Sequence, residues 1–173
     1  MERYPINDTV FYGSEGVCRI VDIVKRRFQG QTEEYYVLQP VYNENSTIYV
    51  PIRNEALIGK MRRILSKEEI MNIIQSLPDA QAVWYENENE RRDRYRDILA
   101  RGNRMEIIQM IKALYLRQKE LHTKGKRLRT NDEHCFKQAE KILYDEFAHV
   151  LNIEPDQVLA FILEQIPEEE PTA

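Results

Sequence analysis

The sequence predicts an α+β protein in which a small antiparallel β-barrel or sandwich is followed by an all-α helical bundle. Up to Leu65, short runs of β-branched and aromatic residues alternate with Gly, Asn and Pro, which is typical of short strands joined by turns. From Ser66 onward, apolar residues recur at helical spacing and Gly is rare. We therefore expect a barrel over residues 1–64, a helical domain over 65–166 and an acidic, mobile tail over 167–173.

The first part of the chain contains five candidate strands. Gly13-Ser14-Glu15-Gly16 predicts a tight loop after the first of them, because two Gly in four residues allow positive φ. We expect a hairpin turn at Gln29-Gly30-Gln31, and Pro51 ends a later strand. Short strands at this spacing favour an antiparallel barrel or sandwich. The expected strands span residues 8–12, 17–25, 35–38, 47–50 and 58–64.

The second part contains segments that begin with helix-capping patterns. Three pairs have capping-box spacing: Ser66 with Glu69, Asn103 with Glu106, and Thr130 with Glu133. Two further helices are expected over 87–100 and from Pro155, a residue that suits the first turn. Apolar residues at helical spacing predict one buried face for each amphipathic helix. For the helix after Asn103 we expect the core residues Ile107, Ile108, Ile111, Leu114 and Tyr115.

Charge is distributed unevenly along the helical part. Residues 84–130 contain 13 Lys/Arg against 7 Asp/Glu, whereas residues 131–173 contain 2 against 11. The whole chain has a formal net charge of −4. A basic segment inside an acidic protein favours an adaptor with one anion-facing surface over a general nucleic-acid coat.

Several functional classes are disfavoured because their motifs are missing. The chain has no GxSxG, no phosphate-binding Gly loop and no Cys/His pair at catalytic spacing, so we expect no enzyme activity and no cofactor. His122, His134 and His149 lack metal-ligand spacing, so no metal site is expected. Cys18 and Cys135 lie in different halves, which fits reduced thiols in the cytoplasm. Without an apolar run of 18 residues or a signal peptide, we expect no membrane partner.

The basic clusters and the lone tryptophan each allow two interpretations. Arginines at positions 91–96 alternate with acidic residues, which suits a solvated helix of ion pairs, but they also suit sequence-independent phosphate contacts. Trp84 is either a half-buried anchor of the bundle or an exposed wedge for a widened minor groove. Lys25-Arg26-Arg27 forms either a solvated rim or part of a protein-binding edge.

The order and spacing of several short motifs along the chain are specific when they are taken together. They are Asn7-Asp8-Thr9-Val10-Phe11-Tyr12-Gly13, Gly16, Tyr35-Tyr36-Val37-Leu38, Ile48-Tyr49-Val50-Pro51, Trp84, Arg91-Arg92, Arg101-Gly102-Asn103 and the helix over 139–147. In this order the motifs resemble the CarD/CdnL family of bacterial transcription regulators, over roughly residues 7–163. The first part also resembles the barrel of the transcription-repair coupling factor, but no GxxxxGK[ST] motor motif is present.

This resemblance implies a Tudor/SH3-like barrel that docks on the β subunit of RNA polymerase. It also implies a helical domain that touches promoter DNA at the upstream edge of the melted region. Tyr49 stands where other members carry an arginine beside the Val-Pro step, and residues 85–90 separate the wedge tryptophan from the Arg pair. The implied polymerase-binding residues are Arg26, Tyr49, Pro51 and Arg53. The expected DNA-binding residues are Trp84, Arg91, Arg92, Arg94, Arg96, Lys126 and Arg127.

We therefore expect a non-enzymatic transcription regulator that stabilises the promoter open complex and takes no small-molecule substrate. It would be cytoplasmic, and associated with the nucleoid through RNA polymerase. The alternative is a protein–protein adaptor of the polymerase that makes no direct contact with DNA. The acidic run after Asn131 and the glutamates at positions 86, 88 and 90 favour this alternative, since they would repel phosphate.

Overall fold

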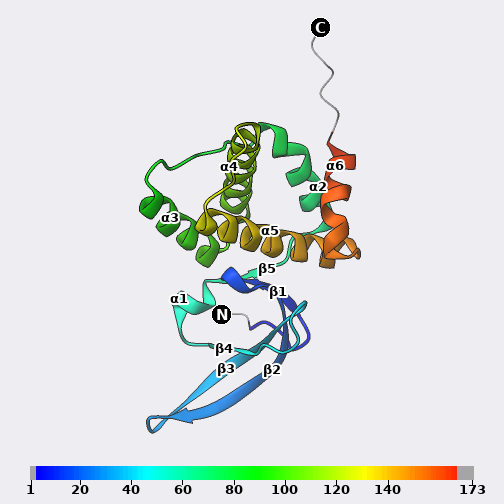
Figure 1. Cartoon of the computed structure of the whole chain (residues 1–173). Helices are drawn as coiled ribbons and strands as arrows, with labels where there is room; N and C mark the ends of the chain where they lie inside the picture. Colours follow the sequence, from blue (N-terminus) through cyan, green and yellow to red (C-terminus); the bar gives the residue numbers. More distant parts are fainter. Residues whose placement is uncertain (1–2, 167–173) are drawn as a thin grey trace.

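The computed structural model describes residues 3–166 and contains a curled antiparallel sheet beside a set of helices (Figure 1). The strands follow the order β4-β3-β2-β1-β5, and the result confirms the predicted α+β class. The predicted acidic tail over 167–173 lies outside the described residues. The strands are β1 (Thr9–Tyr12), β2 (Gly16–Phe28), β3 (Gln31–Pro40), β4 (Ile48–Pro51) and β5 (Met61–Arg63).

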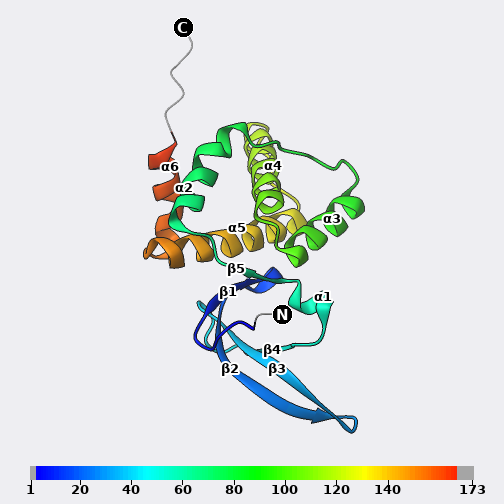
Figure 2. The ribbon, with the colours of Figure 1, turned by 180° about the vertical axis from the view of Figure 1, so that it is seen from behind.

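Strand β2 organises the sheet because it pairs with both β1 and β3. An irregularity in the pairing between Ile20 and Asp22 accompanies the curl of this strand. Beyond the rest of the sheet, β2 and β3 continue as a projecting two-stranded hairpin (Figure 2). Gln29 and Gly30 close it with φ of 50° and 79°, and positive φ at both positions is what a type I′ turn requires. The predicted hairpin turn is confirmed.

The helices begin mostly where the capping patterns predicted. Ser66 and Asn103 each accept a hydrogen bond from the backbone N–H three residues on, and Asn87 does the same. The capping role expected for Thr130 is wrong, because Arg129 occupies the N-cap position and makes no side-chain bond there. The helices are α1 (Glu55–Ile58), α2 (Lys67–Ser76), α3 (Glu88–Arg101), α4 (Arg104–Thr123), α5 (Thr130–Leu151) and α6 (Val158–Gln165). Single 3₁₀ turns are η1 (Gly13–Glu15), η2 (Leu77–Asp79) and η3 (Pro155–Gln157).

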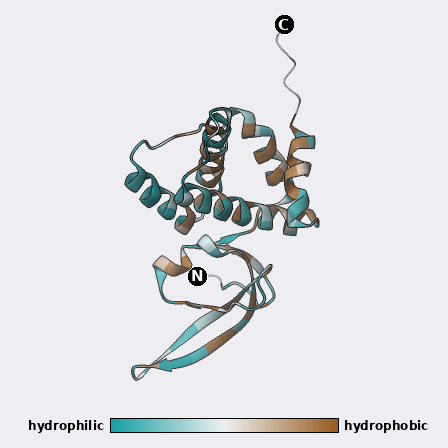
Figure 3. Cartoon of the chain, viewed as in Figure 1, coloured by the Kyte–Doolittle hydropathy of each residue, from teal (hydrophilic) through white to brown (hydrophobic). Residues whose placement is uncertain are grey.

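We call the sheet with α1 the head, and α2–α6 the body. Each has its own buried apolar cluster. The head cluster includes Cys18, and burial raises the pKa of its thiol to about 12, so it stays protonated at neutral pH. Tyr115, expected in the body core, is instead 53% exposed, because it is turned about 100° from the buried Leu114. Figure 3 shows the projecting hairpin and α3 as mainly hydrophilic. Among residues 3–166, no helix combines the length and apolar composition that a bilayer span requires.

Strand β1 connects the two clusters, because successive side chains of a strand point to opposite faces. Val10 and Tyr12 pack in the head cluster, whereas Phe11 between them is fully buried in the body cluster. The break between α3 and α4 closes over this ring at Gly102, whose φ is 69°. A Cβ at Gly102 would lie 2.9 Å from Cε1 of Phe11, so only glycine lets the two elements approach this closely.

A buried carboxylate completes the junction between head and body. Glu146 of α5 is fully buried, and its Oε1 and Oε2 accept hydrogen bonds from Arg104 at 3.1 and 2.6 Å. Oε2 also accepts a bond from the backbone N–H of Leu65 at 3.2 Å. Arg104 donates in addition to the carbonyl of Arg63 at 2.8 Å, and its guanidinium lies 4.2 Å from the ring centre of Phe11. The pair formed by Glu146 and Arg104 therefore holds three elements together: the end of β5, the start of α4 and helix α5.

We predict that Glu146→Ala lowers the free energy of unfolding by about 3–5 kcal/mol, because it leaves Arg104 largely buried without a partner. Urea denaturation followed by circular dichroism measures this loss. Lys137→Ala is the control, since its ion pair with Glu133 is exposed and its loss should stay within about 0.5 kcal/mol. A Glu146→Ala protein as stable as the control would contradict the role given to the junction.

A second, exposed contact ties the end of β5 to the first turn of α2. Arg63 donates two hydrogen bonds to the carboxylate of Glu69, at 2.7 and 2.9 Å. The backbone N–H of Ser66 donates to the same carboxylate at 3.1 Å, which completes a capping box. The bonds from Arg63 first, and then those from Ser66, lower the pKa of Glu69 to about 2.

This lowered pKa makes the free energy of unfolding depend on pH in the acidic range. The unfolded carboxyl takes up a proton near its ordinary value of 4.5, while the folded one stays charged down to about 2. The contribution of Glu69 is therefore present above about pH 4.5 and is lost as the pH falls toward 2. We predict that Glu69→Gln flattens the fall in unfolding free energy across this window, measured by urea denaturation at several pH values. Glu68→Gln in the same turn should keep the wild-type slope; equal slopes for all three proteins would refute this role of Glu69.

Candidate protein and nucleic-acid interfaces

Arg91 of α3 is buried rather than presented to solvent. Only 4% of the residue is exposed, and its Nε and Nη2 donate to the two carboxylate oxygens of Asp132 at 2.8 and 2.7 Å. Its Nη1 donates to the carbonyl of Tyr85 at 2.8 Å. The hydrogen bond with Asp132 raises the pKa of Arg91, which stays charged. The expectation that Arg91 contacts DNA does not fit this geometry, because all three guanidinium nitrogens already hold the segment before α3 against α5.

Trp84 is half-buried, and two guanidinium groups lie close to its ring. The ring centre is 4.3 Å from Cζ of Arg91 and 5.3 Å from Cζ of Arg117 on α4, and the ring packs against the body core. The ring is therefore anchored on the body, and part of the side chain remains accessible. Nothing near Trp84 in the sequence indicates Arg117, because the contact exists only after α4 folds back toward α3.

The other arginines of α3 differ in how much of their charge is already compensated. Arg94 lies 3.8 Å from a carboxylate oxygen of Glu90, and its guanidinium stacks over Tyr85 at 5.4 Å. Arg92 is half-buried, with its Nε 3.6 Å from a carboxylate oxygen of its neighbour Asp93. Arg96 is exposed and forms no ion pair within residues 3–166. The ion-pair interpretation therefore fits Arg92 and Arg94, whereas the charge of Arg96 is left uncompensated within residues 3–166.

The glutamates around Trp84 are partly neutralised by cations of the body. Glu88 accepts a hydrogen bond from Arg129, which precedes α5, and Glu90 faces Arg94. Both also lie in the first turn of α3, where negative charge is favoured by the helix dipole. Glu86 is exposed and has no bonded cation in the described part of the chain.

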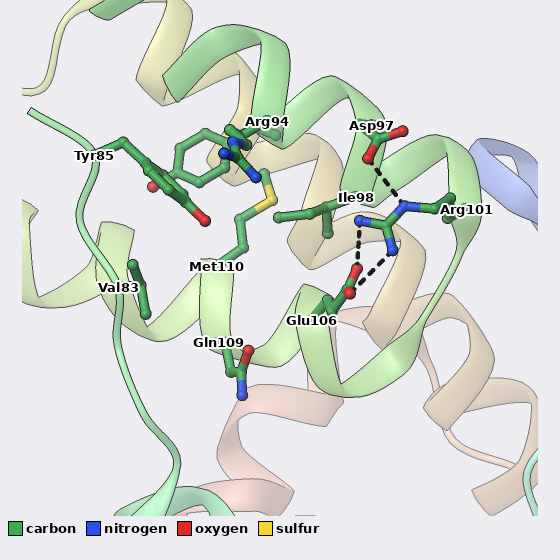
Figure 4. Close-up of a pocket in the computed structure, with 10 residues that line it drawn as sticks. Val83, Tyr85, Arg94, Asp97, Ile98, Arg101, Glu106, Gln109 and Met110 are labelled. Carbon is green, nitrogen blue, oxygen red and sulfur yellow. Dashed lines mark hydrogen bonds and ion pairs between the residues drawn. The ribbon is translucent and has the colours of Figure 1, made fainter. Parts of the chain in front are cut away.

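A small hollow separates the segment before α3 from the facing sides of α3 and α4 (Figure 4). Its volume is about 180 Å³, and Arg101 on its wall is held by Asp97 at 3.0 Å and by Glu106 at 2.8 Å. The cations lining this hollow are thus already paired with carboxylates. The lining includes Val83, Tyr85, Arg94, Ile98, Gln109 and Met110.

Lys126 and Arg127 lie in the exposed segment between α4 and α5. Neither side chain makes a hydrogen bond or ion pair within the described part of the chain. They line one side of a groove whose other side is formed by α4. These two residues, expected to bind DNA, are exposed cations without a paired carboxylate in the described part of the chain, as is Arg96 of α3.

On the head, Arg26 of β2 and Tyr49 of β4 lie together across the intervening strand. The Nη2 of Arg26 is 3.4 Å from the hydroxyl of Tyr49, and its guanidinium lies 5.2 Å from the ring centre. Tyr35 packs edge-on against the same ring at 6.5 Å. Pro51 ends β4 at half burial, and Arg53 follows it in an exposed position. β4 pairs only with β3 within residues 3–166, so its other edge is open.

We predict that Arg91→Ala lowers the free energy of unfolding by about 3–5 kcal/mol, because Asp132 would remain buried without its partner. Arg96→Ala is the matched control on the same helix and should change stability by no more than about 0.5 kcal/mol. Urea denaturation of both variants distinguishes a structural arginine from a surface one. Equal stability of the two variants would count against the buried pair.

Comparison with known families adds two matches that together cover most of the chain. Residues 4–65 match the family described as CarD-like/TRCF RID domain, and residues 69–163 match the one described as CarD, C-terminal domain. The two matches correspond to the head and the body, and they confirm the resemblance found in the sequence motifs. The chain belongs to the CarD family of non-catalytic transcription regulators that interact with RNA polymerase.

Proposed function

We propose that this protein bridges the β subunit of RNA polymerase and the upstream edge of the melted promoter, and thereby stabilises the open complex. The observation that carries the proposal is Trp84, a half-buried aromatic ring held beside basic groups on a body that is locked to the head. The bridge needs both ends and a fixed distance between them.

The head supplies the polymerase end of the proposed bridge. An open strand edge pairs with a partner strand through main-chain hydrogen bonds, and neighbouring side chains supply specificity. β4 offers such an edge, with Tyr49 46% exposed and Arg26 beside it. Pro51 and Arg53 extend the surface beyond the end of the strand. In this chain, Tyr49 stands at the position where other family members carry an arginine. The cation is supplied instead by Arg26 of β2, which lies against Tyr49.

The body supplies the DNA end. An apolar ring that inserts at a base step needs to be stiff and flanked by cations that tolerate the phosphates. Trp84 meets the first condition, because the guanidinium groups of Arg91 and Arg117 lie 4.3 and 5.3 Å from its ring centre. These two groups are themselves bonded to Asp132 and Glu120, so other cations have to meet the phosphates. Arg92 and Arg96 supply phosphate contacts from α3. Lys126 and Arg127 add exposed cations on another part of the body, in the segment before α5.

The gain in open-complex stability follows from a difference in binding. A factor that binds the melted promoter more tightly than the closed one shifts the equilibrium by that difference, and about 1.4 kcal/mol corresponds to tenfold. Contact at the edge of the melted region is available only in the open state. No catalytic step is needed for such an effect.

Two observations favour a second candidate, an adaptor that binds polymerase without touching DNA. Arg91 and Arg94, two of the cations expected at the DNA end, are already bound to carboxylates, and Glu86 is exposed beside Trp84. A mobility-shift assay at low salt, with and without polymerase, separates this adaptor from the bridge.

We predict that Trp84→Ala shortens the lifetime of the open complex by about tenfold, a loss of about 1.4 kcal/mol, while polymerase binding stays intact. Arg26→Ala should instead act on the polymerase end, and weaken binding of the chain to the isolated β subunit in a pull-down. Promoter-complex lifetimes after competitor challenge, together with the pull-down, measure both effects.

Leu159→Ala on α6 is the control for Trp84→Ala, because it removes another partly exposed apolar side chain from the body. It should leave both readouts unchanged. An unaltered open-complex lifetime with Trp84→Ala and normal polymerase binding would eliminate the bridge in favour of the adaptor. Failure of the wild-type chain to bind the β subunit would eliminate both.

A further inference from the structure

A groove of about 540 Å³ lies between the exposed side of α4 and the segment that leads into α5. We propose that this groove binds a single-stranded segment of DNA, with Tyr115 as a stacking platform for a base. The inference rests on the proposed function, since a melted promoter is the source of that strand. The groove is lined by Tyr115, Gln118, Lys119, His122, Lys126, Arg127, Leu128 and Glu133.

The side chains from α4 share one face of the helix. Lys119 and His122 follow Tyr115 by four and seven residues, which places all three on one side. Tyr115 is 53% exposed although it adjoins the fully buried Leu114. Its ring is therefore not part of the core. It lines the groove, and packing does not account for an aromatic residue at this exposed position.

The charge of the groove is positive and largely uncompensated. Lys119, Lys126 and Arg127 make no side-chain hydrogen bond or ion pair within residues 3–166. The acidic residue in the lining, Glu133, is already bonded to Lys137 at 3.1 Å on its own helix. Most arginines of the body, such as Arg91, are matched to a carboxylate, so these three cations stand out as available to an anion.

An exposed ring inside a hollow of free cations favours a single strand over a duplex. Duplex phosphates require only cations, because paired bases keep their faces stacked on one another. A single strand exposes base faces, which stack on aromatic side chains, while Lys and Arg follow its backbone. Tyr115 therefore supplies the element that duplex binding would leave unused.

The groove is separate from the surface around Trp84. Arg117, which contacts Trp84, is two residues from Tyr115, and two residues turn a helix by about 200°. The two aromatic residues thus face opposite sides of α4. In the bridged complex, Trp84 would meet the edge of the duplex, and the groove would receive a separated strand.

The test uses fluorescence anisotropy of the full chain with a short labelled oligothymidine strand and with a labelled duplex. We expect Tyr115→Ala to weaken binding to the single strand by about tenfold and to leave duplex binding unchanged. Tyr115→Phe should bind like the wild type, because stacking needs the ring and not the hydroxyl. Leu116→Ala is the matched control, since it removes a similarly exposed apolar side chain, 45% against 53%, from a different face.

A second variant tests the charges. Replacing Lys126 and Arg127 together with Gln should reduce the slope of log affinity against log salt by about 1.4 on the single strand, at about 0.7 for each lost phosphate contact.

Four outcomes would overturn the proposal: no measurable binding of the single strand, an equal loss on single strand and duplex with Tyr115→Ala, an unchanged salt slope, or tighter binding of an RNA of matching sequence or an acidic peptide. These outcomes are independent of polymerase binding and of the effect of Trp84→Ala on promoter lifetime. The groove can therefore fail while the proposed function stands, and the reverse is also observable.

Discussion

The arrangement of this protein depends on one buried carboxylate, that of Glu146. A charge with no exposed surface is tolerated only where its hydrogen bonds are satisfied, and Arg104 and the N–H of Leu65 satisfy them. Because Leu65 follows the last strand and Arg104 begins α4, the same carboxylate ties the head to the body. Phe11 adds an apolar plug beneath the Arg104 guanidinium. The two parts are therefore packed as one structure, although each has its own core.

The buried pairs also divide the basic residues of the body into two kinds. The side chains of Arg91 and Arg104 are 5% and 11% exposed and are bonded to buried carboxylates, whereas Arg96, Lys126 and Arg127 are exposed and unpaired within residues 3–166. A surplus of Lys and Arg in the sequence therefore overstates the charge that the folded protein offers to an anion. It is the position of the remaining free cations, rather than their total, that decides which surface attracts an anion.

Local sequence patterns predicted the features that depend on interactions between residues close together in the chain. The α+β class, the Gln29-Gly30 turn and the caps at Ser66 and Asn103 follow from spacing and from short-range hydrogen bonds, and the structure confirms them. Residues that depend on distant partners escaped prediction. Arg91 looks like its exposed neighbours in sequence, and its burial follows only from Asp132 on α5. Side chains on different helices meet only through tertiary packing, and no local sequence pattern indicates which of them will be partners.

Helix α5 carries both anchors and sets the distance between the two ends of the proposed bridge. Asp132 in its first turn holds Arg91 and, through it, Trp84, while Glu146 near its end holds the head. At about 1.5 Å per residue, these two positions lie about 21 Å apart along the axis. A helix keeps this length without loss of further conformational entropy on binding, whereas a flexible linker would lose affinity through ordering. In the proposed bridge, a rigid spacer would let polymerase binding by the head present Trp84 at a set distance from the enzyme. The energy of the polymerase contact would then be available to position a ring that by itself covers little of the DNA.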